Sequence, residues 1–183
     1  MRFVLLSLLL FVPLVSHAVE FTVYQSGYQP KQLAWMVETD VEDQREKRQF
    51  YHIVKNDLRS SQSFAILNPL SFIADPISTM SKIDYADWRI IGADVVSAAL
   101  LHRTENGWQA DVQVHDPFRT KLLGTKTIRA KSNELRWLAH EVSNFIYETI
   151  IGVHGHFNSH ILYVTKRGQD ADLMYMDQDG ANL

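Results

Sequence analysis

The sequence predicts an α/β (α+β) fold in which a mixed sheet of about five strands is packed by two main helices. Alternating apolar and polar residues with tight turns between residues 94 and 128 indicate three adjacent antiparallel strands. Apolar residues at three- and four-residue spacing within residues 50–58 and 135–150 indicate two amphipathic helices. Short apolar runs at residues 33–37 and 64–67 add two more strands.

The first half of this domain is predicted as strand, helix, strand and short helix. Residues 33–37 are continuously apolar, which indicates a strand buried on both faces. The first helix places Phe50, Ile53, Val54 and Leu58 on one face and ends at residues 60–61. The strand at 64–67 stops before the Asn-Pro pair at 68–69. A short helix over residues 84–88 is expected to stop at Gly92.

The second half is predicted as three strands in a meander, followed by a helix. The strands are expected at residues 94–101, 108–115 and 121–128, with turns at 105–107 and 116–117. Ser132 or Asn133 is expected to cap the helix, with Glu134 in its positive first turn. Its broad apolar face is expected to pack on the sheet, and Gly152 occupies the place of a left-handed stop.

The chain closes with a hairpin pattern. Residues 161–165 and 172–177 alternate and flank a polar turn at 166–170, and a second turn with Gly180 at its bend follows. A lone hairpin is marginally stable in water, and the sequence stops before a third strand. We therefore expect residues 154–183 to be a linker and the opening of a further β domain whose remainder is absent.

The other end reads as a cleavable secretory signal over residues 1–18. Arg2 supplies a positive start, residues 3–15 are almost entirely apolar, and Ala18 is a small residue at the expected cleavage point. The apolar run is short for a spanning helix, although an uncleaved anchor is the alternative. No Cys follows it, which closes the lipoprotein route, and the chain has none from which to build a disulfide framework.

The segment that follows the signal, residues 19–30, reads as a short strand with a flexible attachment. Residues 19–24 alternate, and turn-forming residues follow as far as Pro30. Such a strand can bind a partner by β-augmentation. An edge strand that merely completes the sheet is the alternative. The net charge of −3, with both signs mixed, provides no electrostatic case for nucleic acid or an anionic membrane.

Catalytic motifs are missing from the sequence. There is no Gly-x-Ser-x-Gly elbow, Walker loop or dinucleotide glycine fingerprint. His140 and Glu141 begin a zincin-like motif, but Asn144 stands where the second His must be. His154, His156 and His160 could form a histidine-based metal site, but their interpretation as polar linker residues at a domain junction is strongly favoured. We expect no catalytic residue, cofactor or metal.

The order of these parts resembles the N-terminal region of the TolB family, the periplasmic component of the Tol-Pal envelope system of Gram-negative bacteria. The resemblance rests on an ordered set: the strand that ends in Ser26-Gly27, the helix running into residues 56–60, Trp88 before residues 92–96, the run from 149 to 157, and the turn at 177–182. This chain has Gln25 where the family usually has Asp, and Gln62 where the family usually closes the first helix with Gly.

The resemblance implies a TolB-like N-terminal α/β domain over residues 31–153 and a six-bladed β-propeller whose first blade is incomplete here. It implies a non-enzymatic periplasmic adaptor that binds the C-terminal domain of TolA and supports outer-membrane integrity and invagination during cell division. The lipoprotein Pal would be a partner of the propeller. A truncated fragment without function is the alternative. The residues matching the TolA-binding segment are Val19, Glu20, Phe21, Thr22, Val23, Tyr24, Gln25, Ser26 and Gly27.

Overall fold

The computed structural model describes residues 29–40, 42 and 44–182. The predicted signal at residues 1–18 and the predicted partner-binding residues 19–27 lie outside this part of the chain. The elements are β1 (Lys31–Thr39), α2 (Gln44–Ser60), β2 (Phe64–Ile66), η2 (Pro69–Ser71), α3 (Pro76–Ser81), α4 (Tyr85–Ile90), β3 (Val95–Thr104), β4 (Gly107–Asp116), β5 (Lys121–Lys131), α5 (Leu135–Ile151), β6 (His160–Arg167) and β7 (Asp170–Asp177). No described helix is long and apolar enough to cross a bilayer.

A mixed five-stranded sheet with the order β2-β1-β3-β4-β5 forms the centre of the domain, which confirms the predicted fold class. β1 lies between β2 and β3 and is parallel to both, whereas β3, β4 and β5 form the predicted antiparallel meander. The connection from β1 to β2 contains α2, and the connection from β2 to β3 contains α3 and α4, because parallel strands need a crossover. β1 is therefore an interior strand, and its central residues are buried on both faces as predicted.

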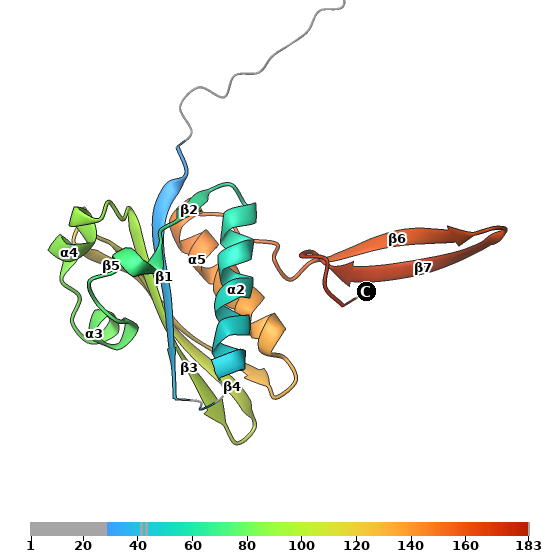
Figure 1. Ribbon diagram of the computed structural model, residues 1–183, viewed down its shortest axis with the longest axis horizontal. Coiled ribbons are helices and arrows are strands. Elements are labelled where there is room, and N and C mark those ends of the chain that lie inside the picture. Colours follow the sequence, from blue (N-terminus) through green and yellow to red (C-terminus); the bar gives the residue numbers. More distant parts are fainter. Residues whose placement is uncertain (1–28, 41, 43, 183) are drawn as a thin grey trace, which may run out of the picture.

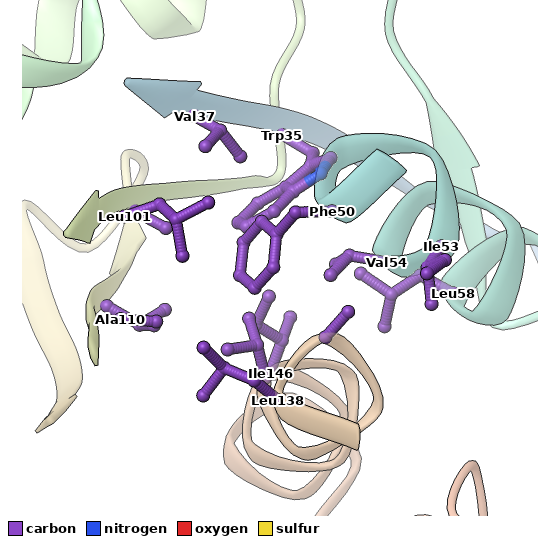
Figure 2. Close-up of a cluster of buried hydrophobic side chains, with 14 of the residues drawn as sticks. Trp35, Val37, Phe50, Ile53, Val54, Leu58, Leu101, Ala110, Leu138 and Ile146 are labelled. Atoms are coloured by element: carbon purple, nitrogen blue, oxygen red, sulfur yellow. The ribbon is translucent and has the colours of Figure 1, made fainter. Parts of the chain in front are cut away.

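The two main helices cover one face of the sheet, and the short helices α3 and α4 cover the other (Figure 1). The alternation of β1 separates the two cores: Leu33, Trp35 and Val37 pack with α2 and α5, while Ala34 and Met36 pack with Trp88 of α4. Figure 2 shows Phe50 of α2 and Leu138 and Ile146 of α5 converging beneath Trp35. This apolar contact fixes α5 against the sheet and thereby sets the position of everything that follows α5.

Two details at helix ends bear on the sequence predictions. The expected cap of α5 at Ser132 or Asn133 is wrong, because Glu134 is the N-cap residue and its carboxylate accepts the Lys131 N–H instead. The expected stop at Gly152 is confirmed by its left-handed φ of 85°. Gln62, in the place of the usual family glycine, also has a positive φ of 58°, a conformation that strains a residue with a Cβ.

β6 and β7 pair antiparallel as the predicted hairpin and form a sheet of their own. The hairpin projects away from the domain, and only its base lies near α5 (Figure 1). Its apolar side chains are exposed: Leu162 is 69% exposed, Val164 58% and Leu173 71%. The hairpin is therefore held to the domain by contacts at its base, and these contacts define the candidate site.

Candidate functional site

The predicted partner-binding segment is joined to the sheet at its interior. Residues 29 and 30 lead directly into β1, whose first residue, Lys31, donates its N–H to the carbonyl of Ser63 at 3.0 Å. β1 then continues between β2 and β3. A segment attached here is joined to a strand that is hydrogen-bonded to a neighbour on each side.

The structure does not bring together the three histidines considered as a metal site. His154 Nδ1 lies 3.1 Å from Glu148 Oε2, and its ring meets the His156 ring edge-on at 6.4 Å. His160 is instead the first residue of β6, and its Nε2 lies 3.5 Å from Oδ1 of Asp177 on β7. Among the described residues, the metal-binding side chains that do converge are His140, Asp177 and Asp179, whose ligand atoms lie within 4.8 Å of one another.

His140 is held by a buried network between α2 and α5. Its Nδ1 lies 2.8 Å from Asp57 Oδ2, and the Ser143 hydroxyl donates to the same oxygen at 2.7 Å. Asp57 and His140 are each 3% exposed. Because a carboxylate only accepts hydrogen bonds, Nδ1 carries a proton, and in the neutral form of the ring Nε2 would then present a lone pair.

The Nε2 atom of His140 is buried and has no hydrogen-bond partner within the described part of the chain. It faces the carboxylates of Asp177 and Asp179 at the base of the hairpin. Arg136, one helical turn before His140, supplies the cation here: its Nη2 lies 2.8 and 2.7 Å from the two oxygens of Asp179 and 3.3 Å from Asp177 Oδ2. Burial raises the pKa of Asp179, but its hydrogen bonds with Arg136 and the Ala181 N–H lower that pKa more, so it lies below the ordinary value.

The linker between α5 and the hairpin is fixed by Asn144, the residue that breaks the zincin-like motif. Its Oδ1 accepts the buried Phe157 N–H at 3.1 Å. The Phe157 ring itself is buried against the domain core. Gly155 lies so close that a Cβ there would come within 2.5 Å of Asn144 Oδ1, so the linker needs glycine at this position. Glu141 Oε1 accepts from the Asn158 amide as well.

A cleft of about 290 Å³ opens between the first turns of α5 and the base of the hairpin. His140, His160, Asp177 and Trp137 line it, among other residues. Trp137 is 44% exposed, in contrast to the fully buried Trp35, Trp88 and Trp108. The arrangement is not that of a nucleophilic triad, because the Ser143 hydroxyl bonds Asp57 and not Nε2 of His140. Its chemistry is that of a polar junction with one unused imidazole nitrogen.

This junction was not predicted from the sequence, although the spacing of polar residues in α5 indicates it. Four polar residues recur at every fourth position of α5, a helix that also carries a broad apolar face: Arg136, His140, Asn144 and Glu148. Residues four apart share one helix face, so they form a polar stripe beside the apolar one. The partner residues lie far away in the chain, and nothing in the local pattern identifies them.

The fold and the junction together define a class of protein: a small α+β domain whose last helix carries the base of a β-hairpin. The profile of the family described as the TolB amino-terminal domain matches residues 22–123. The chain belongs to this family.

Known relatives agree with this assignment. The Tol-Pal system protein TolB of Alcanivorax borkumensis is 35% identical over 132 residues, which cover 70% of this chain and 30% of the relative. That of Polaromonas naphthalenivorans is 30% identical over 167 residues, covering 91% of this chain and 38% of the relative. The crystal structure of TolB from Acinetobacter baumannii shares the fold, with a TM-score of 0.72 at 23% identity, covering 84% of this chain and 37% of that one. The chain thus spans about a third of the length of these relatives.

Proposed function

We propose that this chain acts as a non-enzymatic periplasmic adaptor of the Tol-Pal system and binds the C-terminal domain of TolA through residues 19–27. The observation that carries the proposal is that the family match begins at Thr22, inside this alternating segment, and continues through the domain. Relatives that carry the Tol-Pal name support the system. The role in outer-membrane integrity and in invagination at cell division belongs to the same proposal.

The mechanism is β-augmentation. The segment adds a strand to an exposed edge of the partner, main-chain hydrogen bonds supply affinity, and alternate side chains supply specificity. One face of the strand carries Val19, Phe21 and Val23, and the other carries Glu20, Thr22 and Tyr24. Ordering a free segment on binding costs about 2–5 kcal/mol, so a modest affinity is expected.

Deletion of residues 19–27 tests the proposal directly. Calorimetric titration with the purified C-terminal domain of TolA should show binding to the mature chain and none to the deletion variant. The thermal unfolding of the two should agree, because the described five-stranded sheet is built without these residues. Binding that survives the deletion contradicts the assignment.

A pair of matched substitutions sharpens the test. Phe21→Asp and Thr22→Asp each place a carboxylate in the segment, but on opposite faces of the strand. One of them should reduce TolA affinity much more than the other if the segment binds as a strand. Equal losses would contradict a strand-like mode, even if the segment as a whole is required.

The structural alternative, a segment that only completes the sheet, has its own observable. Amide exchange in the free chain should be fast at Phe21 and Val23 if the segment is available to a partner. Slow exchange in the absence of TolA would favour the edge-strand role.

Two further expectations complete the proposal. The mature chain is expected to begin at Val19, and the intact mass of the chain recovered from periplasm tests this cleavage. Residues 154–183 are expected to be the linker and the start of the first propeller blade, so Pal is a partner only of a chain with the whole propeller. Capture of Pal by residues 19–183 alone would contradict that division of roles.

A further inference from the structure

We propose that His140, Asp177 and Asp179 bind one divalent transition-metal ion of the Zn²⁺ class, which ties the base of the β6–β7 hairpin to helix α5. The three ligand atoms lie within 4.8 Å of one another and come from two elements that are distant in the sequence. Coordination of one ion at about 2 Å would require these ligand atoms to move closer together. A bound ion would therefore link the domain to the hairpin.

The state of the His140 ring is the first support. A metal-binding histidine usually donates its second ring N–H to a carboxylate, which fixes the tautomer and the ring orientation. His140 makes this contact with Asp57 at 2.8 Å, and Ser143 holds Asp57 in turn. In the neutral form of the ring, this network would leave the Nε2 lone pair fixed in orientation and available to a metal ion.

The burial of Nε2 is the second and independent support. His140 is 3% exposed, and Nε2 has no partner among the described residues. A buried polar atom without a hydrogen bond is unfavourable, and native structures seldom contain one without a reason. In the neutral form of the ring, the Nε2 lone pair would lie near two carboxylates, and a metal ion between the three groups would remove the repulsion and satisfy the nitrogen. Imidazole with carboxylates is a donor set that suits Zn²⁺.

Arg136 is the competitor for this site. Its guanidinium pairs with both oxygens of Asp179 and lies 3.3 Å from Asp177 Oδ2. It brings one positive charge to two carboxylates, and it donates to neither the ring nor the lone pair of His140. A metal ion and Arg136 would therefore share the same acids, and Arg136 also holds these two carboxylates close to α5.

The experiment is a Zn²⁺ titration of the purified chain without a polyhistidine tag, near neutral pH, in competition with a chromogenic chelator. One ion should bind per chain. Asp179→Asn should weaken binding by about tenfold or more, and Asp57→Asn by about 10–100-fold through the ring. Circular dichroism identifies any variant that fails to fold, and the Asp179 side chain, 26% exposed, is the safest position to change.

Matched controls separate this site from other acids and imidazoles. Asp172→Asn removes an exposed carboxylate from the same strand, β7, away from the junction, and should not alter binding. The double variant His154→Ala and His156→Ala should also bind normally. A second readout is amide exchange at Gln178, whose N–H donates to Ser159 O at the hairpin base and should slow when Zn²⁺ is added.

Three results would overturn the proposal. The first is no saturable binding at micromolar Zn²⁺. The second is unchanged affinity in Asp179→Asn, and the third is binding lost in the His154 and His156 double variant, which would move the site to the linker. None of these measurements involves TolA, so the outcome is independent of the proposed adaptor role.

Discussion

Replacement of Arg136 by Gln should undock the hairpin base from α5 without unfolding the domain. The Arg136 side chain is 26% exposed, as is that of Asp179, and that of Asp177 is 15% exposed. Hydrogen bonds to charged groups contribute about 1.5–3 kcal/mol when shielded, whereas exposed ion pairs contribute about 0–1 kcal/mol. These side chains are mostly but not fully shielded, so we expect a loss of about 1.5–2 kcal/mol in the free energy of docking.

Amide hydrogen exchange measures this loss where it occurs. The Gln178 N–H, bonded to Ser159 O, and the Phe157 N–H, bonded to Asn144 Oδ1, report on the hairpin base and the linker. Because 1.4 kcal/mol is tenfold, exchange at Gln178 should accelerate by about 10–30-fold. Arg119→Gln is the control, since its side chain is 79% exposed and its pair with Asp116 is long at 3.6 Å. That change should have little effect.

The docking of the hairpin base through Arg136 and Asp179 should also weaken in acid. The pKa of Asp179 is lowered in the folded chain, so its carboxylate adds stability above its unfolded pKa, which is about 3.9. This stability is lost as the pH falls below that value and through the lowered folded pKa.

Two results for Arg136→Gln would refute a separately docked hairpin. One is an exchange rate at Gln178 within twofold of that in the parent chain, and the other is an equal loss of stability throughout the domain.

The remaining predictions concern single backbone and titratable positions. Gln62→Gly should raise the free energy of unfolding by about 0.5–1 kcal/mol, because Gln62 has a φ of 58° that glycine adopts without strain; urea denaturation measures it. Gly107→Ala should lower that free energy by about 3 kcal/mol or more, since the new Cβ would lie 2.0 Å from Ala130 O at a φ of 153°. Burial lowers the pKa of His115, so stability should fall as the pH drops below about 6.5 and toward the folded pKa; His115→Gln should flatten this slope in melts between pH 7 and 5.

The elements that could be predicted are those with a strong local pattern. The meander of β3, β4 and β5 was visible because alternation and turn residues coincide, and the two main helices because their apolar faces are broad. The order of the sheet was not predictable, because the apolar run of β1 indicates burial on both faces but does not identify β2 and β3 as its neighbours.

The short elements between residues 69 and 81 escaped prediction for a different reason. η2 and α3 are three and six residues long, too short for an apolar period to be recognised. Their capping residues were nevertheless readable: the Asn68 side chain accepts the Leu70 N–H, and that of Asp75 accepts the Ser78 N–H, each directly before a proline. A proline after a capping residue is a start signal for a helix.

The junction could not be predicted because its partners are distant in the sequence. His140 meets Asp57 across 83 residues, and Arg136 meets Asp177 across 41. The three linker histidines attracted attention because they are near neighbours in the chain. Proximity in sequence is a poor guide here, since His154 lies beside Glu148 at the end of α5, whereas His160 is the first residue of β6 and lies beside Asp177.

The polar stripe of α5 explains why these contacts form in this order. After Gly152 the chain reverses and runs back along the helix, so contacts made later along the chain fall progressively nearer the start of α5. Glu148 meets His154, Asn144 meets Phe157, and Arg136 meets Asp177 and Asp179. A four-residue spacing keeps all of these polar groups on one face. The apolar stripe thus fixes α5 to the sheet and the polar stripe fixes the hairpin to α5, so a substitution of the partly exposed Arg136 should move the hairpin without disturbing the core.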